Sequence, residues 1–335
     1  MRVTIADVAR VAGVSKTTVS RVLNTRSEVD RSTAARVREV IDRMGYVPSS
    51  GAVGLARGSS RTIGMLVPSL TWPWMGEVVQ GVVDTLEAAE FGLLLFTCNR
   101  GTESVERFTS QVSARAFDGL LVVEPENTLD MLTALHRKGL PVVLIDDRGH
   151  HPDFPYVTAA NHEGGAAAAR HLLRMGRRRP LVLTGPTRFG CVRDRLAGFR
   201  TTYAESGHAL DSGLVVESDF TEVDGRETVR RMVREGRDFD AVFAHNDLGA
   251  VGAMAALRAS GLRVPDDVAV IGFDDIPMAP LTEPALTTVR QPMRRMGETA
   301  AGMLLARLMG GTAPAAPVVL PTELVVRQSA PATAG

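Results

Sequence analysis

The sequence predicts an α/β protein in which a short all-α segment precedes a larger core built on parallel β-sheet. Three observations carry this prediction. Up to about residue 47, apolar residues recur at helical spacing. After Arg61, short continuous apolar runs alternate with helical segments, which is typical of a parallel sheet covered on both faces. Several of these runs end in Pro, Asp, Asn or Gly, and in open α/β folds ligands bind at the carboxyl ends of the strands.

The segment 1–47 is predicted to form three short helices, because each part of it has an apolar face and residues that can begin or end a helix. The residues that can cap or end these helices are Thr4, Gly13, Ser15, Asp30 or Ser32, and Gly45. The apolar faces consist of Ile5, Val8, Ala9, Ala12, Val19, Val22, Leu23, Val37, Val40, Ile41 and Met44.

A stretch rich in small residues, PSSGAVGLARG at 48–58, is predicted to be a linker or a marginal helix. The strands of the core are expected in the runs TIGMLVP, FGLLLFT, DGLLVVEP, PVVLIDD, RRPLVLTGP, FDAVFAHND and VAVIGFDD. The tail after Leu324 shows no apolar heptads, so we expect no coiled-coil assembly segment there.

Composition narrows the class of protein. A length of 335 residues suggests two or three domains. The net charge of zero hides an asymmetry, since residues 1–61 hold 11 Lys and Arg against 5 Asp and Glu. A basic end on an acidic body is expected of a nucleic-acid-binding arm, although a solvated surface explains the charge alone equally well. Cys98 and Cys191 have no metal or redox spacing, which indicates reduced packing residues of a cytosolic protein. No apolar run approaches the ~20 residues of a membrane span, and the first residues lack a secretory signal pattern.

The first two predicted helices have the features of a helix-turn-helix. Ala9 supplies a small residue where two helices can cross, and Gly13 supplies the turn. The second helix would expose Lys16, Thr17, Ser20, Arg21 and Asn24. Arg can bridge guanine, Asn can bridge adenine, and Ser or Thr can bond a base or a phosphate. This set predicts DNA as the partner, with a helical hairpin that serves only for packing as the alternative.

Segments along nearly the whole chain, from Val3 to about Val326, closely resemble the LacI/GalR family of bacterial transcriptional regulators. They are VTIADVARVAGVSKTTVSRVLN, VREVIDRMGYVP, RTIGMLVP, FDGLLVV, RLAGFR, HNDLGAVGAMAALRASGLRVPDDVAVIGFDD and PALTTVRQPMRRMGETAAGMLL. The resemblance implies a core like that of periplasmic sugar-binding proteins, with two α/β subdomains around an effector cleft. The implied domains are a DNA-binding headpiece at 1–47, a hinge helix or linker at 48–60 and an effector-binding and dimerisation core at 61–335, with subdomains at about 61–160 with 290–322 and 161–289 with 323–330.

The resemblance also assigns residues to DNA contacts. Lys16 and Thr17 occupy the variable operator-reading positions of the family motif, and Arg21 occupies a less variable base-contacting position. Leu55 matches the leucine that two hinge helices of a dimer wedge into the minor groove. The residues expected to contact DNA are Thr4, Ser15, Lys16, Thr17, Ser20, Arg21, Asn24 and Leu55.

The hinge departs from the family pattern. Val53 stands where the family often has an arginine, and Gly51 and Gly54 each cost a helix roughly 1 kcal/mol relative to alanine. We therefore expect a hinge that folds only on binding DNA, with a larger ordering cost than is usual.

Polar and aromatic residues at predicted strand ends, which also match pocket positions of the family, form the predicted effector site. Arg195 in RDRLAGF can bridge two hydroxyls or a carboxylate, and Asp274 in GFDD can accept from a hydroxyl pair. Both tryptophans of the chain lie in PSLTWPWMGE, either as walls of the cleft or as core or dimer-contact residues. The predicted effector-binding residues are Trp72, Trp74, Asp146, Arg195, Phe220, Asn246 and Asp274, with Glu124 and His245 as weaker candidates. This set favours a carbohydrate over a purine, although a purine would also stack on tryptophan.

Together these features predict a cytoplasmic, homodimeric repressor without a cofactor or metal, which a small sugar-like effector releases from a palindromic operator. The alternative within the family is a corepressor-dependent or activating regulator that responds to a purine or another small metabolite. Two alternatives come from other classes. A solute-binding protein would carry a secretory signal and lack the DNA-reading surface. A glycoside hydrolase could use Asp146 and Asp274, but no nucleophile–base pairing or metal spacing is evident.

Overall fold

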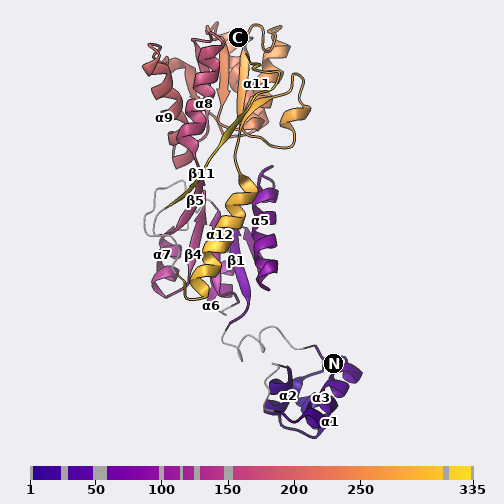
Figure 1. Ribbon diagram of the computed structural model, residues 1–335. Coiled ribbons are helices and arrows are strands. Elements are labelled where there is room, and N and C mark those ends of the chain that lie inside the picture. Colours follow the sequence, from indigo (N-terminus) through magenta and orange to yellow (C-terminus); the bar gives the residue numbers. More distant parts are fainter. Residues whose placement is uncertain are drawn as a thin grey trace. The chain divides into compact units, whose positions relative to one another are not determined.

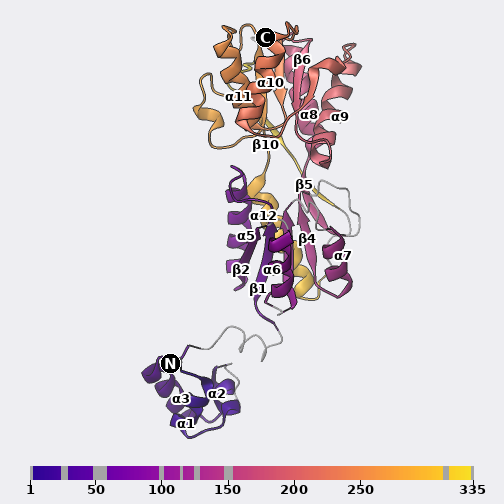
Figure 2. The same ribbon diagram turned by 180° about the vertical axis from the view of Figure 1, so that it is seen from behind.

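The computed structural model describes residues 3–23, 29–47, 59–97, 102–113, 116–123, 129–146, 154–311 and 317–332 (Figures 1 and 2). The chain divides into a unit that ends at Arg61 and a unit that begins at Thr62. Within the described ranges, no helix is both long and apolar enough to cross a membrane.

The amino-terminal unit contains three helices, α1 (Ile5–Ala12), α2 (Lys16–Leu23) and α3 (Arg31–Met44). Helix α1 begins with a capping box, in which the side chains of Thr4 and Asp7 each accept from the other's backbone N–H. It ends at Gly13, whose φ of 66° lies in the left-handed region that glycine adopts without strain. The predicted apolar faces meet in a small core of Val8, Ala9, Ala12, Val19, Val22, Val37, Val40 and Tyr46. The predicted all-α headpiece is therefore confirmed.

The first sheet of the core is parallel throughout and has the strand order β11-β5-β4-β3-β1-β2. Its strands are β1 (Thr62–Val67), β2 (Gly92–Thr97), β3 (Gly119–Val123), β4 (Val142–Ile145), β5 (Tyr156–Ala159) and β11 (Val318–Leu320). One face packs on α5 (Met75–Ala88) and α12 (Met293–Leu308), and the other on α6 (Thr102–Ser113) and α7 (Leu129–Arg137). Every residue of β3 and β4 is buried, which explains why these strands are apolar without alternation.

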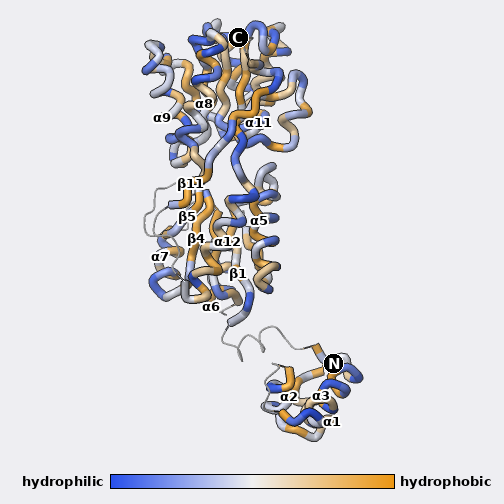
Figure 3. Tube along the Cα trace, viewed as in Figure 1, coloured by the Kyte–Doolittle hydropathy of each residue, from blue (hydrophilic) through white to orange (hydrophobic). Residues whose placement is uncertain are grey.

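The second sheet has the order β12-β10-β9-β8-β6-β7, and β12 alone among these strands runs antiparallel, against β10. Its strands are β6 (Pro180–Thr184), β7 (Val215–Glu217), β8 (Ala241–Ala244), β9 (Ala269–Asp274), β10 (Thr287–Arg290) and β12 (Glu323–Val325). The helices are α8 (Asn161–Arg174) and α9 (Gly190–Glu205) on one face, α10 (Glu222–Arg234) and α11 (Asp247–Ala259) on the other, and the short 3-10 turns η1 (Ser212–Leu214) and η2 (Ala279–Leu281). Hydrophobic residues concentrate along the strands of both sheets (Figure 3). The predicted two-sheet α/β core is confirmed.

The chain crosses between the two sheets three times: after β5, after β10 and after β11. The first and third crossings lie against each other, because the backbone N–H of Ala160 donates to the carbonyl of Leu320 at 2.8 Å. The hydroxyl of Thr322 donates back to the carbonyl of Ala160 at 3.2 Å. The segments that join the sheets are therefore hydrogen-bonded to one another.

Glycines let paired helices on one face of a sheet pack backbone to backbone. A Cβ built on Gly165 of α8 would lie 2.1 Å from the carbonyl oxygen of Arg195 on α9. A Cβ on Gly198 of α9 would lie 1.9 Å from the carbonyl oxygen of His162 on α8. No side chain fits at these distances, so glycine is required at both crossing points. The glycines with equivalent contacts are Gly81 and Gly297 between α5 and α12, and Gly225 and Gly252 between α10 and α11.

Candidate DNA-reading helix and effector cleft

Helix α2 has one buried side and one exposed polar side. Val19 and Val22 are buried in the headpiece core, while Lys16, Thr17 and Arg21 are exposed. Ser20 is half-buried, between the two sides. Three residues of the groove-reading types are therefore presented together on one short helix.

Two of the predicted DNA contacts also begin helices. The Oγ of Ser15 accepts from the backbone N–H of Thr18 at 3.1 Å, which starts α2. Thr4 starts α1, and its hydroxyl donates to Asp7 at 2.7 Å. That hydrogen bond, followed by one from Arg10, lowers the pKa of Asp7 to about 2. Any contact of Thr4 or Ser15 with a phosphate must therefore coexist with its role as a cap.

Three predicted positions lie outside the described residues. They are Asn24, at the end of the predicted reading helix, Leu55, in the predicted hinge, and Glu124, a weaker effector candidate.

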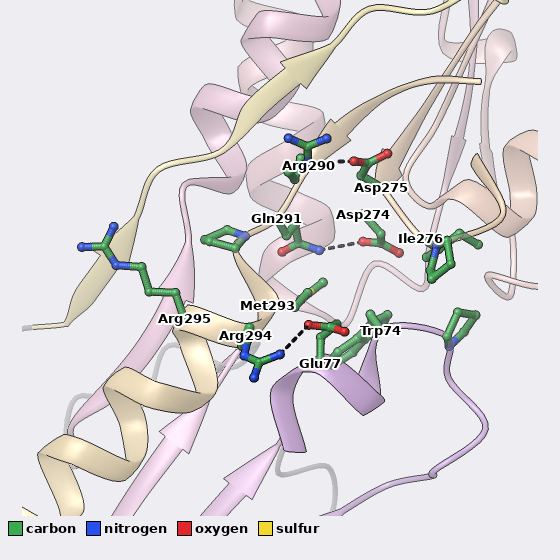
Figure 4. Close-up of a pocket in the computed structure, with 13 residues that line it drawn as sticks. Trp74, Glu77, Asp274, Asp275, Ile276, Arg290, Gln291, Met293, Arg294 and Arg295 are labelled. Atoms are coloured by element: carbon green, nitrogen blue, oxygen red, sulfur yellow. Dashed lines mark hydrogen bonds and ion pairs between the residues drawn. The ribbon is translucent and has the colours of Figure 1, made fainter. Parts of the chain in front are cut away.

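A pocket of about 330 Å³ in the core unit takes its walls from elements of both sheets (Figure 4). Trp74 and Glu77 contribute from the start of α5, which packs on the first sheet. Asp274 contributes from the end of β9 in the second sheet, and Gln291 from the crossing that follows β10. Two predicted effector residues, Trp74 and Asp274, thus line one pocket.

Asp274 is held in a fixed orientation at the carboxyl end of β9. Its backbone has a φ of 118°, and its side chain is largely buried. The Nε2 of Gln291 donates to its Oδ1 at 2.6 Å (Figure 4). Gln291 was not among the predicted effector residues, although its place directly after β10, close to a strand end like Asp274 at the end of β9, was the available signal.

The neighbouring Asp275 belongs to a network of ion pairs. Its Oδ2 lies 2.7 Å from Nε of Arg290, and its Oδ1 lies 2.7 Å from Nη2 of Arg327. Arg290 also lies 3.3 Å from Glu323, which is on the strand that follows the third crossing. The network therefore joins β9, β10 and β12 at the edge of the pocket.

The two tryptophans have different surroundings. Their ring centroids are 5.5 Å apart with planes tilted by 42°, and both rings pack against the apolar cluster of the first sheet. Trp74 lines the pocket, whereas Trp72 lies outside its lining. Beside Trp74, Glu77 lies 4.0 Å from Arg294, which also pairs with Asp84.

Asp146 and Arg195 lie outside the lining of this pocket. Asp146 follows β4 with a φ of 55° and is buried, and the hydroxyl of Thr158 donates to it at 3.4 Å. Arg195 on α9 is 3% exposed, although arginine is rarely buried without partners. Its Nε donates to Oδ1 of Asn161 at 2.8 Å and its Nη1 to the carbonyl of His245 at 2.6 Å.

Phe220 and Asn246 lie together on the second sheet. The Nδ2 of Asn246 donates to the carbonyl of Phe220 at 2.6 Å, and its Oδ1 accepts from the N–H of Gly249 at 2.9 Å, capping α11. The ring of Phe220 stacks on Phe189 with centroids 6.5 Å apart. Buried Cys191 packs in the same apolar cluster. The amide of Asn246 therefore stabilises the loop that carries Phe220.

Asp247, which was not among the predicted effector residues, is fully buried at the start of α11. It accepts from the hydroxyl of Thr288 and, at 2.8 Å, from the N–H of Ile276. Burial, followed by the nearby Asp274 carboxylate, raises the pKa of Asp247 well above its ordinary value. Burial likewise holds the pKa of His245 well below that of an exposed imidazole.

The pocket presents a flat aromatic ring, an oriented carboxylate–amide pair and ion pairs at its edge. Such groups suit a polar ligand with hydroxyls and C–H faces. The residues that line it include no serine, cysteine or histidine, so the lining lacks the usual nucleophile–base pair. The arrangement is suited to binding.

Comparisons with known proteins find relatives along nearly the whole chain, for both the headpiece and the core. Residues 4–49 match the family described as bacterial regulatory proteins, lacI family, and residues 169–330 match the periplasmic binding protein-like domain. The HTH-type transcriptional repressor PurR of Photobacterium profundum is 34% identical over 329 residues, which cover 97% of this chain and 98% of that protein. The HTH-type transcriptional regulator CelR of Thermobifida fusca is 34% identical over 339 residues, which cover 98% of each.

Solved structures match over nearly the whole chain as well. The complex of CelR with cellobiose has a TM-score of 0.75 at 34% identity and covers 98% of this chain and 100% of that chain. The lac repressor dimer bound to operator and the anti-inducer ONPF has a TM-score of 0.86 at 28% identity and covers 99% of this chain and 100% of that one. These relatives are transcriptional regulators and not enzymes.

Proposed function

The chain belongs to the LacI family of bacterial transcriptional regulators, and on that premise we propose that it is a repressor released from operator DNA by a sugar that binds between its two sheets. As a member of this family it is a ligand-responsive DNA-binding protein, not an enzyme, and it acts in the cytoplasm where its operator lies. The sugar, its site residues and the direction of the response are the parts that we propose.

The observation that carries the choice of a sugar is the shared pocket of Trp74, Asp274 and Gln291. An indole ring offers a flat surface to the C–H face of a pyranose, and a carboxylate held by an amide accepts from neighbouring hydroxyls. CelR, a relative that matches over 98% of each chain, was solved with cellobiose. Cellobiose is therefore the first ligand to test.

The pocket also suggests how binding changes DNA affinity. A ligand that touches both Trp74 and Asp274 contacts elements of two sheets, so its affinity depends on their separation. The ligand shifts the equilibrium between conformations only by the difference in its affinity for them. A sugar that binds more tightly when the two sheets are at a separation unsuited to DNA binding would therefore release the operator.

For DNA we propose a homodimer that places two α2 helices in successive major grooves of a palindromic operator, as the dimeric lac repressor structure suggests. Lys16, Thr17 and Arg21 would read bases, and Thr4, Ser15, Ser20 and Asn24 would add backbone or base contacts. Leu55 of each hinge would enter the minor groove at the centre.

The first experiment selects genomic fragments with the purified full chain at moderate salt, with and without cellobiose, and sequences them. We expect a few palindromic sites beside genes for sugar uptake or breakdown, and fewer of them with cellobiose present. An absence of any site preference over random DNA, with and without ligand, would contradict the repressor. A parallel selection with a purine base tests the alternative within the family, and sites that appear only in that selection would identify a corepressor-dependent regulator.

A second experiment measures the ligand directly by tryptophan fluorescence, since Trp74 lines the pocket and the chain has one other tryptophan, Trp72. Trp72→Phe leaves Trp74 as the single reporter. We expect cellobiose to change its emission, and Asp274→Asn to weaken binding about tenfold or more. Asp266→Asn is the matched control, because its exposed carboxylate lies outside the pocket lining. Equal weakening in both variants would refute a specific role for Asp274.

A further inference from the structure

A chain of polar contacts runs across the first crossing between the two sheets, and Asn161 stands at its centre. We propose that Asn161 is a positioning residue, which fixes the guanidinium of Arg195 for the effector and links it to the end of β5. This inference rests on the proposed function and on the prediction from the sequence that Arg195 contacts the effector, although Arg195 lies outside the lining of the pocket of Trp74 and Asp274.

Asn161 uses both ends of its amide. It is the first residue of α8 and is 4% exposed. Its Oδ1 accepts from Nε of Arg195 at 2.8 Å, while its Nδ2 donates to the carbonyl of Ala159 at 3.1 Å. Asparagine supplies an acceptor and a donor on one short side chain. An aspartate would keep the bond to Arg195 but would set a carboxylate oxygen against the Ala159 carbonyl.

Arg195 is held from three directions. Its guanidinium carbon lies 3.8 Å from the ring centroid of Phe273, and its Nη1 donates to the carbonyl of His245. Asn161 supplies the third contact. Of the two hydrogen bonds among these contacts, this is the one that a side chain accepts. Among the described residues, no hydrogen bond uses Nη2, so the guanidinium is fixed with one nitrogen left for a ligand.

Helix packing brings the two residues within reach. Asn161 and Gly165 are one turn apart on α8, so they lie on the same side of that helix. Gly165 sits against the backbone of Arg195, where a Cβ would be 2.1 Å from the carbonyl oxygen. This close approach allows a short asparagine to bond to the Nε of a neighbouring helix.

The contacts continue into the first sheet. The Nδ2 of Asn161 lies 3.5 Å from the hydroxyl of Thr158, which in turn donates to Asp146 at 3.4 Å. These contacts are long and individually weak. They nevertheless place two predicted effector residues, Asp146 of the first sheet and Arg195 of the second, on either side of one asparagine. A shift at the first crossing would therefore displace the arginine.

The test observes the Nε–H of Arg195 in the full, ligand-free chain by arginine-selective TROSY spectroscopy. The signal is assigned by its loss in Arg195→Lys. In the wild type we expect a sharp signal that exchanges slowly with water, because the group is buried and bonded. Asn161→Asp should keep that protection, and Asn161→Leu should speed the exchange at least tenfold. Asn161→Ser, whose hydroxyl is too short to reach Arg195, replaces the leucine variant if that variant fails to fold.

A purely structural role for Asn161 predicts a different result. Both variants would then lower stability, while the Arg195 signal would stay protected, and that outcome would overturn the proposal. Loss of protection in Asn161→Asp to the same degree as in Asn161→Leu would also overturn it, because the carboxylate retains the acceptor.

A second arm titrates cellobiose by tryptophan fluorescence. If the wild type binds it, we expect the dissociation constant to rise about tenfold or more in Asn161→Leu and by less in Asn161→Asp. Unchanged affinity in Asn161→Leu would overturn the proposal. If the wild type binds neither cellobiose nor a purine base, the proposed effector assignment fails, and the Arg195 signal still decides whether Asn161 positions the arginine.

Discussion

Replacing Gly165 with alanine should separate α8 from α9 and loosen Arg195. The new Cβ would lie 2.1 Å from the carbonyl oxygen of Arg195, and 3.1 Å from its Cα. Real Cβ contacts essentially never fall below 3.0 Å, so the helices must move apart by about 0.9 Å or more. The same movement would stretch the bond of 2.8 Å between Arg195 and Asn161 beyond hydrogen-bonding range.

The expected cost combines three terms. Overpacking costs about 1–3 kcal/mol, and losing a hydrogen bond to a charged group costs about 1.5–3 kcal/mol. Alanine regains up to about 1 kcal/mol of helix propensity over glycine. The net loss is about 1.5–6 kcal/mol, which is a large part of the ~5–15 kcal/mol that stabilises a typical protein. The melting temperature should fall by about 3–20 °C.

The assay is thermal and urea unfolding of the full chain, followed by circular dichroism. Gly302→Ala is the matched control, because a Cβ at that exposed position in α12 meets nothing within 4 Å. The control should be neutral or more stable by up to about 1 kcal/mol. If Gly165→Ala proves as stable as Gly302→Ala, the backbone contact between α8 and α9 does not have the closeness on which this reasoning depends.

Three further predictions concern other parts of the chain. Asp247→Asn should gain stability relative to the wild type as pH rises above about 4. Because the pKa of Asp247 is raised in the folded state, the protonated carboxyl stabilises the fold most at low pH, and this stabilisation is lost as pH rises through the pKa of the folded state. In urea unfolding, the free energy of unfolding of the wild type should fall relative to that of the variant by about 1.4 kcal/mol per pH unit. Arg21→Ala should weaken binding to the selected operator and relax its sequence preference by ~1–3 kcal/mol in gel-shift competition, whereas Arg307→Ala, outside the headpiece, should change neither. Thr4→Ala should cost the start of α1 ~1 kcal/mol, visible as faster amide exchange in that helix; unchanged exchange would argue against the capping box.

Much of the fold could be predicted from local pattern alone. The strands β3 and β4 are buried on both faces, so their sequences carry the unbroken apolar runs that a parallel sheet demands. Helix α1 is capped by Thr4 and ends at Gly13, and α3 ends at Gly45. Each of these residues acts on backbone groups of its own helix, a few positions away in the sequence. Such signals need no knowledge of the rest of the chain.

The candidate site was predicted less completely, because its partners come from distant segments. Residues at strand ends could be nominated from sequence, and Trp74 and Asp274 do line one pocket. The hydrogen bond between Asn161 and Arg195 depends on the close packing of α8 on α9 at Gly165 and Gly198. No periodic pattern in the sequence predicts that bond. The amide of Asn246 caps α11 and bonds to the carbonyl of Phe220. Its contact with a ligand stays a prediction, as do the DNA contacts of Asn24 and Leu55.

The placement of the pocket limits which residues can decide the response to a ligand. A hundredfold change in DNA affinity requires a ligand to prefer one conformation by about 2.7 kcal/mol. At about 1 kcal/mol for each net hydrogen bond, two or three contacts made in one conformation only would supply that difference. Contacts to a single sheet exist in both conformations and contribute affinity without any shift. For a ligand in the proposed site, we therefore expect the response to arise where the ligand joins Trp74 or Glu77, beside the first sheet, to Asp274 of the second sheet or to Gln291 in the crossing after β10. Substitutions there should alter induction as well as binding.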